Sequence, residues 1–299
     1  MNASFTSISI IYNPNSTGPG KQLATQLKRD LKKLQPTQLV RLIKTEYVGH
    51  AELLAFELAR ASSKPLIISA SGDGGYHEVV NGLLRAQAES ATPIAGLLPA
   101  GNANDHYHNL HNADTATAIC EQQIQTVDVL RLKCLQKGRS LQRYAHSYIG
   151  LGLTPVVGRE LNKTELNRIN EIWITLQSLA KLRPTKIISL GKKRSYDSII
   201  CSNVSKMSKV LKLTKSSEVT LMQDGKFEVT AAPSRSKIQL LRYLIKATTV
   251  GLDGGRITDH YKFKTIKPIV MQLDGEICRI DGNSDVDITI SRRVLRCII

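Results

Sequence analysis

Three polar, glycine-rich segments are the places where this chain could hold a phosphorylated ligand. They are residues 13–21 (NPNSTGPGK), 71–78 (SGDGGYHE) and 99–105 (PAGNAND). Glycine lets backbone N–H groups approach an anion closely, and a helix that begins after such a loop adds the positive end of its dipole. A single loop of this kind is ordinary turn chemistry, but three of them predict a phosphate cradle.

Carboxylates beside these loops could hold the metal ion that bound phosphates require. Asp73 lies between two glycines, and a carboxylate next to phosphates commonly binds Mg²⁺. The alternative is that Asp73 caps the helix that follows it. Asn104 and Asp105 have the same alternative, as caps of a helix that begins near His106.

The segments around these loops alternate between strand-like and helix-like patterns. Short apolar runs predict strands at residues 7–12, 65–70, 94–98 and 126–132. Apolar residues at helical spacing predict helices at residues 20–34, 49–61 and 78–87. This alternation predicts βαβ units and a parallel sheet, in which loops that follow the strands converge at one edge.

The pattern changes after residue 132. Segments such as 186–190 and 198–201 predict strands, and one helix is expected at residues 169–182, with Trp173 in the core. We therefore expect an α/β protein with two domains. A Rossmann-like parallel-sheet domain covers residues 1–130, an antiparallel β-sandwich domain covers 131–290, and the tail 291–299 packs back on the first domain.

The chain is large enough for two cores and is strongly basic. It has 299 residues, 41% of them hydrophobic, and a formal net charge of +16. Residues 151–250 hold 18 Lys and Arg against 7 Asp and Glu, a surplus of 11. An anionic partner is expected, and nucleic acid, lipid headgroups and phosphorylated small molecules all remain candidates at this point.

Other features of the sequence bear on the compartment. No run approaches the roughly 18 to 20 apolar residues of a membrane span, and residues 1–11 lack the pattern of a signal peptide. The five cysteines are scattered without metal-type spacing, which favours buried thiols. We expect a cytoplasmic protein.

Taken in order, these motifs resemble the catalytic region of the diacylglycerol kinase, sphingosine kinase and bacterial soluble lipid kinase superfamily. Residues 71–83 (SGDGGYHEVVNGL) resemble its GGDGTxxEVxNGL motif, and residues 99–105 resemble its PxGTxND motif. Other matching segments are 13–18 (NPxSG), 45–51 (TEYVGHA, whose threonine contacts nucleotide in the family), 223–227 (QDGKF, a structural Mg²⁺ loop) and 274–276 (the DGE signature).

The resemblance implies an ATP-dependent lipid kinase with Mg²⁺ as a second cofactor. Residues 1–130 would bind the nucleotide, and residues 131–290 would bind a lipid hydroxyl, with diacylglycerol as the first candidate. The implied nucleotide contacts are Asn13, Pro14, Asn15, Ser16, Thr17, Thr45, Gly72, Asp73, Gly74, Gly75, Glu78, Gly101, Asn102, Asn104 and Asp105. The implied metal ligands or their supports are Asp73, Asp128, Leu221, Asp224 and Lys226.

The resemblance also implies which residue accepts the proton of the lipid hydroxyl. Glu276, with Asp274 beside it, would accept the proton of the lipid hydroxyl as that oxygen attacks the γ-phosphorus in line. The basic residues of 151–250 would then make peripheral contact with an anionic membrane.

Three residues depart from the family pattern. Ser71 replaces the first glycine of GGDGT, and Gly75 and Asn102 replace the threonines of the two motifs. The lost hydroxyl at Gly75 implies weak ATP binding, which Gly75→Thr would tighten if the backbone there accepts a Cβ.

Several alternatives stay open at this stage. They are a catalytically weak or silent protein that binds nucleotide and lipid, and an NAD kinase relative, because that family shares the GGDG loop. Nucleic-acid binding is not expected, since no recognition motif is present and only 5% of the residues are aromatic. A homodimer is left open.

Overall fold

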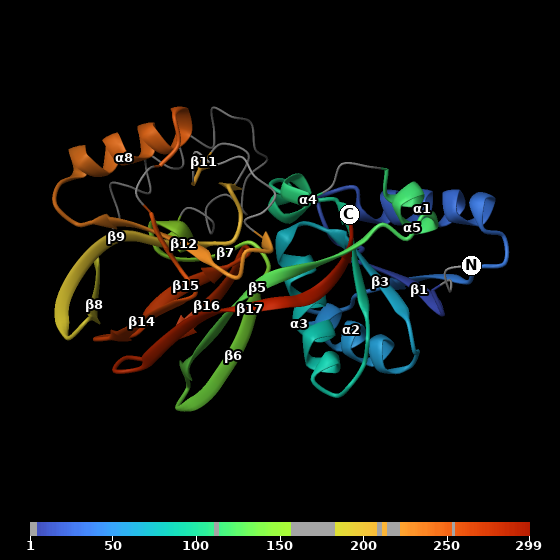
Figure 1. Cartoon of the computed structure of the whole chain (residues 1–299), viewed down its shortest axis with the longest axis horizontal. Coiled ribbons are helices and arrows are strands. Elements are labelled where there is room, and N and C mark those ends of the chain that lie inside the picture. The colour runs from blue at the N-terminus through green and yellow to red at the C-terminus, as the bar shows by residue number, and fades with distance from the viewer. Residues whose placement is uncertain (1–4, 111–113, 157–182, 208–210, 214–221, 253–254) are drawn as a thin grey trace. The chain divides into compact units, whose positions relative to one another are not determined.

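The computed structural model (Figure 1) describes residues 5–110, 114–156, 183–207, 211–213, 222–252 and 255–299. Its helices and strands form two compact units. Unit 1 consists of Met1–Asp128 and Arg292–Ile299, and unit 2 consists of Val129–Ser291. The chain therefore passes from one unit to the other twice, within strand β5 (Ile124–Gln136) and within strand β17 (Asp285–Ile298).

Unit 1 is built on a parallel sheet in the strand order β2-β1-β3-β4, with the end of β17 beside β4. Its complete elements are β1 (Ser7–Tyr12), α1 (Gly20–Leu34), β2 (Val40–Lys44), α2 (His50–Arg60), β3 (Pro65–Ser71), α3 (Asp73–Gln87), β4 (Ile94–Pro99), α4 (Asp105–Leu110) and α5 (Thr115–Cys120). Strands β1, β3 and β4 are almost entirely buried, as expected for the inner strands of a parallel sheet covered by helices on both faces, whereas the edge strand β2 is partly exposed.

Helices cover both faces of this sheet. On one face, Leu27 and Leu31 of α1 pack with Ile8 and Ile10 of β1. On the other face, α2 and α3 lie side by side (Figure 1), and a Cβ at Gly82 of α3 would come within 2.2 Å of the carbonyl oxygen of Glu52 in α2. Glycine at this position is therefore what allows the two helices to approach so closely.

Unit 2 is built from antiparallel strands. Its complete elements are β6 (Arg139–Ala145), β7 (Tyr148–Gly152), β8 (Thr185–Ser189), β9 (Lys192–Ser202), β10 (Lys206–Met207), β11 (Leu211–Lys212), β12 (Phe227–Pro233), α8 (Lys237–Thr249), β13 (Arg256–Thr258), β14 (His260–Thr265), β15 (Ile269–Leu273) and β16 (Glu276–Ile280). The strands follow the order β16-β15-β7-β9-β8-β14-β17, while β12 pairs with β9, and β5 pairs with β17 and β6. One apolar core, which includes Leu132, Ile199, Phe227 and Ile288, takes side chains from strands throughout the unit.

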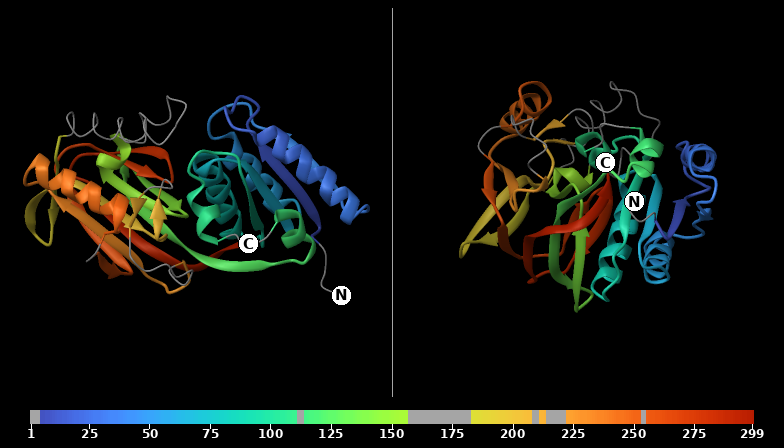
Figure 2. Two further views of the ribbon diagram at one scale, coloured as in Figure 1. Left: turned by 90° about the horizontal axis from the view of Figure 1, so that it is seen from above. Right: turned by 45° about the vertical axis from the view of Figure 1, so that its right-hand side comes forward.

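Helix α8 follows β12 at the edge of unit 2, where Figure 1 shows it in orange and Figure 2 shows it from two further directions. The Ser236 hydroxyl caps it by accepting a hydrogen bond from the Gln239 backbone N–H at 3.2 Å. Among the described residues, no helix combines the length and the apolar character needed to cross a lipid bilayer.

The expected fold class is confirmed, with parallel βαβ units in the N-terminal part and antiparallel strands in the C-terminal part. Several elements differ from the sequence-based expectation. Strand β2 and helices α5 and α8 were not predicted, and α3 begins at Asp73 rather than Glu78. The helix expected at residues 169–182, with Trp173, lies outside the described residues.

Candidate functional site

The polar loops of unit 1 all follow the strands of the parallel sheet at its carboxyl edge. Tyr12 at the end of β1 is in register with Lys44 of β2 and Ala70 of β3, and Ser71 is in register with Pro99 of β4. The loops after four neighbouring strands therefore start at the same level. This edge is where open parallel sheets bind ligands.

The loops after β3 and β4 touch through their backbones. A Cβ placed on Gly101 would lie 2.3 Å from the Cα of Gly72, and a Cβ on Gly72 would lie 3.0 Å from the Cα of Gly101. The loop after β1 joins them, because a Cβ on Gly18 would lie 1.9 Å from the carbonyl oxygen of Ala100. Glycines are thus required for the three loops to converge.

Helix α3 begins inside the SGDGG segment. Gly72 is its N-cap, and the first backbone hydrogen bond of the helix runs from the Tyr76 N–H to the Gly72 carbonyl at 3.1 Å. The N–H groups of the first turn have no acceptor within the helix, and Gly74 and Gly75 carry no side chain of their own that could cover them. A concentration of N–H groups at the positive end of a helix dipole favours an anion.

The carboxylate of Asp73 links the loop after β3 to the loop after β4. Its Oδ1 accepts a hydrogen bond from the backbone N–H of Asp105 at 2.8 Å. Asn104 closes the loop after β4. Its Oδ1 accepts a hydrogen bond from the Gly101 N–H at 2.9 Å, and its Nδ2 donates one to the Gly101 carbonyl at 2.7 Å. Asn102, in contrast, is exposed at the tip of this loop.

Ser71 and Gly75 fit together across the first turn of α3. The Ser71 hydroxyl lies 2.7 Å from the Ser69 hydroxyl and donates to the Gly72 carbonyl at 3.0 Å. A Cβ on Gly75 would lie 2.6 Å from Ser71 Oγ and 2.7 Å from Ser71 Cβ. The serine side chain therefore occupies the space that a side chain at position 75 would need.

The loops after β1 and β2 are more open. In the exposed segment Asn13, Pro14, Asn15, Ser16 and Thr17, local hydrogen bonds set the backbone: Asn13 Oδ1 accepts from the Asn15 N–H at 2.9 Å, and Ser16 Oγ accepts from the Gly18 N–H at 3.2 Å. Thr45 lies beside this segment, with its N–H donating to the Tyr12 carbonyl at 2.9 Å.

Glu78 contacts the start of α2. Its two carboxylate oxygens accept hydrogen bonds from the backbone N–H groups of Gly49 at 2.9 Å and Ala51 at 3.2 Å. A carboxylate in this position stabilises the first turn of α2 and complements its dipole. The geometry supports a structural contribution of Glu78 to the neighbouring loops.

Sequence reasoning missed two features beneath these loops. One is the position of the Ser71 hydroxyl. The other is a buried contact in which the Tyr76 hydroxyl and His106 Nε2 lie 3.3 Å apart. No spacing in the sequence indicates either contact, because the partner residues come together only when the loops fold.

The metal positions implied by the family resemblance are divided between the two units. Asp128 of β5 is fully buried, and its Oδ1 accepts the backbone N–H of Arg293 in β17 at 2.6 Å. Asp224 is exposed in unit 2 and accepts the Lys226 N–H at 2.8 Å, while Leu221 lies outside the described residues. Within the described ranges, no three His, Cys, Asp or Glu side chains form a metal-binding cluster.

The DGE segment of unit 2 forms the turn of a hairpin. Leu273 of β15 pairs with Glu276 of β16, and the two residues between them have positive φ angles, 50° at Asp274 and 102° at Gly275. Asp-Gly is the sequence that favours such a two-residue type I′ turn. The turn places Glu276 on the exposed start of β16.

The side chain of Asp274 points inward from this turn. It is fully buried, and its carboxylate accepts three backbone hydrogen bonds, from His146 at 2.8 Å, Ser147 at 2.9 Å and Tyr148 at 3.0 Å. Three such bonds engage both carboxylate oxygens. Asp274 therefore anchors the hairpin to the segment before β7, whereas Glu276 is accessible.

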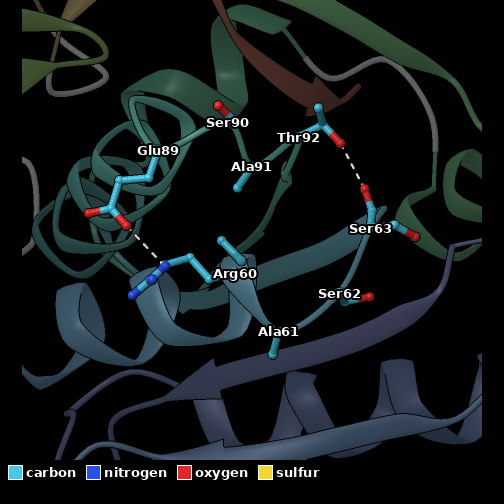
Figure 3. Close-up of a pocket in the computed structure, with 9 residues that line it drawn as sticks. Arg60, Ala61, Ser62, Ser63, Glu89, Ser90, Ala91 and Thr92 are labelled. Atoms are coloured by element: carbon cyan, nitrogen blue, oxygen red, sulfur yellow. Dashed lines mark hydrogen bonds and ion pairs between the residues drawn. The ribbon is translucent and has the colours of Figure 1, made fainter.

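A pocket of unit 1 lies at the opposite, amino edge of the parallel sheet (Figure 3). Its volume is about 510 Å³, and it is lined by residues 59–63 at the end of α2 and 89–92 before β4. An exposed ion pair between Arg60 and Glu89, at 3.0 Å, crosses its rim. None of the candidate site residues lines this pocket.

Comparisons with known proteins point to one family. Residues 7–132 match the model of the diacylglycerol kinase catalytic domain. The chain is 37% identical over 111 residues to a diacylglycerol kinase of Staphylococcus epidermidis, and 38% identical over 111 residues to one of Staphylococcus aureus. Each match covers 34% of this chain and 31% of the relative, so the chain aligns with about a third of the length of these relatives.

The fold has a counterpart over its whole length. The crystal structure of a diacylglycerol kinase from Bacillus anthracis superposes with a TM-score of 0.70, covering 100% of this chain and 98% of the other. Sequence identity in this comparison is 18%, so it is the fold that is shared.

Proposed function

We propose that the chain is an ATP-dependent lipid kinase, because residues 7–132 match the model of the diacylglycerol kinase catalytic domain. It would transfer the γ-phosphoryl group of ATP to the hydroxyl of a membrane lipid, with diacylglycerol as the first candidate. The observation that carries this proposal is the convergence of the matched motifs at the carboxyl edge of the unit 1 sheet.

The residues of unit 1 fit a nucleoside triphosphate. The touching glycines Gly72 and Gly101 and the start of α3 offer backbone N–H groups to phosphates. Around them, Thr45, Asn102 and the segment 13–17 provide polar groups for the rest of the nucleotide. We assign Asn104 and Glu78 to holding these loops in place, through the backbone hydrogen bonds that they make.

Asp73 is the proposed Mg²⁺ ligand. Mg²⁺ usually takes one or two carboxylates together with phosphate oxygens and water, so the lack of a three-residue cluster among the described residues fits such a site. When bound with ATP, the ion would neutralise the charge that develops on the transferred phosphoryl group. Asp105 supports Asp73 by donating its backbone N–H.

Glu276 is the proposed general base for the lipid hydroxyl. It lies on the accessible start of β16, where a substrate hydroxyl can reach its carboxylate. Asp274 is better suited as a positioning residue, because its carboxylate is buried and accepts three backbone N–H groups. It would fix the turn that presents Glu276.

The test is phosphoryl transfer from radiolabelled ATP to a panel of acceptors. The panel holds diacylglycerol, monoacylglycerol and a sphingoid base in mixed micelles, with NAD as the soluble acceptor that an NAD kinase relative would use. We expect label in one lipid and none in NAD. Label in NAD alone, or ATP binding without transfer to any lipid, would contradict the proposal in favour of one of the two alternatives.

Two variants in the DGE turn test the different roles of Glu276 and Asp274. Glu276→Gln should lower turnover by about 10² or more while leaving ATP affinity and the unfolding midpoint unchanged. Asp274→Ala should lower the free energy of unfolding by about 2 to 4 kcal/mol, because it leaves buried N–H groups without their acceptor. Unchanged turnover in Glu276→Gln removes Glu276 from the mechanism.

A further inference from the structure

Helix α8 has two apolar faces, and among the residues that the structure describes only one of them packs against the strands of unit 2. Leu240, Leu244 and Ala247 are buried. Leu240 and Leu244 pack with Leu153 and Ala232, so this stripe attaches α8 to the antiparallel strands. A helix on the surface of a domain needs one such stripe.

The second face is exposed. Ile238, Leu241 and Ile245 have 65%, 38% and 54% of their surface accessible, and they are spaced three and four residues apart. At about 100° per residue, this spacing puts them on one stripe, whose centre lies roughly 125° around the helix from the centre of the buried stripe. Val250, just past the end of the helix, is 61% exposed.

Basic side chains flank the exposed stripe. Arg242 and Lys246 lie on one side of it by helical geometry, and Lys237 lies on the other; all three are exposed. Arg235 adds a fourth positive charge just before the helix, and the sequence from 229 to 252 contains no Asp or Glu. A helix with an apolar stripe between basic flanks has the composition of one that lies in a membrane interface.

We infer that the exposed face of α8 docks on the surface of an anionic lipid bilayer. The apolar side chains would enter the boundary between headgroups and acyl chains, and the basic side chains would meet lipid phosphates. Charge argues against a second copy of the chain as the occupant. A two-fold contact would bring the four positive charges of one helix against the same four of the other.

This surface adds to the proposed lipid kinase function and can be tested apart from it. Binding to vesicles is measured by sedimentation without ATP, using phosphatidylcholine vesicles with and without phosphatidylglycerol. The test variant carries Ile238→Gln, Leu241→Gln and Ile245→Gln. The matched control carries Leu34→Gln, Leu39→Gln and Leu53→Gln, three leucines of unit 1 with similar exposure.

The α8 variant should lose at least about tenfold in partitioning to anionic vesicles, while the control should change by less than about twofold. Circular dichroism and the unfolding midpoint should be the same as in the wild type for both. A second variant, Arg242→Gln with Lys246→Gln, should weaken binding to anionic vesicles and leave the weak binding to neutral vesicles unchanged.

Wild-type partitioning by a folded α8 variant would overturn the inference. A second result would also overturn it: the wild type is a dimer, and the α8 variant is a monomer that binds vesicles as well as the wild type does. The exposed face of α8 would then be a contact between two copies of the chain. Phosphorylation of a short-chain diacylglycerol in detergent-free solution separates the two proposals. If the wild type lacks that activity but binds vesicles through α8, the kinase assignment fails and the docking surface stands.

Discussion

Compared with the family motif, the larger side chain stands at position 71 instead of position 75. The motif has glycine at the first position and threonine at the second, whereas this chain has a hydroxyl at position 71 and no side chain at position 75. Because Ser71 fills the space beside Gly75, the two changes compensate each other sterically. The chain keeps a hydroxyl within the loop, although it is carried by the other residue.

This geometry changes the expectation for Gly75→Thr. Gly75 lies in α3 and has no positive φ angle, so the backbone accepts a Cβ, but the new side chain would collide with Ser71. We expect Gly75→Thr alone to lower the free energy of unfolding by about 1 to 3 kcal/mol, as overpacking does. The double variant Ser71→Gly with Gly75→Thr should recover most of that loss.

Urea unfolding of the wild type, both single variants and the double variant gives the coupling energy directly. We expect a coupling of about 1 to 3 kcal/mol, since the side chains contact each other. Calorimetry of ATP and Mg²⁺ binding on the same four proteins shows whether the threonine hydroxyl also tightens binding once it fits. Additive effects in both measurements would refute the compensation.

At the level of single residues, the sequence identified the loops but not the partners of their side chains. Asp73 was placed beside a phosphate site, with helix capping as the alternative; the structure adds a contact that the sequence did not indicate, in which Asp73 Oδ1 accepts the backbone N–H of Asp105. Such a contact joins residues far apart in sequence and depends on loop geometry. No local pattern could have indicated it.

At the scale of elements, hydrophobic periodicity predicted elements that bury one regular apolar stripe and missed elements that lack one. Helix α1 buries Ala24, Leu27 and Leu31 at helical spacing and was predicted at its observed bounds. Strand β2 was missed because only Val40 of its residues is fully buried. Helix α8 was missed because its two apolar faces hide the period of a single amphipathic stripe.

The end of β17 is an element whose removal should weaken unit 1. Cys297 pairs with Ala95 of β4, the Ile299 N–H donates to the Gln123 carbonyl at 3.1 Å, and Ile298 is fully buried in the core that includes α1 and β3. The tail therefore completes one side of the parallel sheet. It does so after the chain has passed through the whole of unit 2.

Ile298→Ala should lower the free energy of unfolding by about 2 to 5 kcal/mol, the range for removing a buried branched side chain. Leu39→Ala is the control, because Leu39 is exposed on the same unit, and it should change stability by less than about 0.5 kcal/mol. Denaturant titration followed by circular dichroism measures both. A loss of less than about 1 kcal/mol in Ile298→Ala would show that the tail contributes little.

At the scale of the whole chain, the uneven charge is the feature that the fold alone does not require. The surplus of 11 positive charges in residues 151–250 falls entirely in the sequence of unit 2, whereas residues 51–150 hold 8 basic and 9 acidic residues. A field of this sign raises the local concentration of anionic surfaces and speeds encounter with them. The proposed division, with ATP bound by unit 1 and lipid by unit 2, gives the asymmetry a purpose.

Because that attraction acts through water, it should weaken as salt screens it. Raising the salt concentration from about 0.1 M to about 1 M shortens the Debye length from about 10 Å to about 3 Å. We expect partitioning to vesicles that contain phosphatidylglycerol to fall by about tenfold or more over this range, because each basic residue near the leaflet contributes about 1 kcal/mol at low salt. Partitioning to pure phosphatidylcholine should stay weak and nearly constant, because it depends on apolar contact, and circular dichroism at each salt concentration checks that the fold persists. Salt-independent binding to neutral vesicles that equals binding to anionic ones would show that the positive charge has no part in membrane contact.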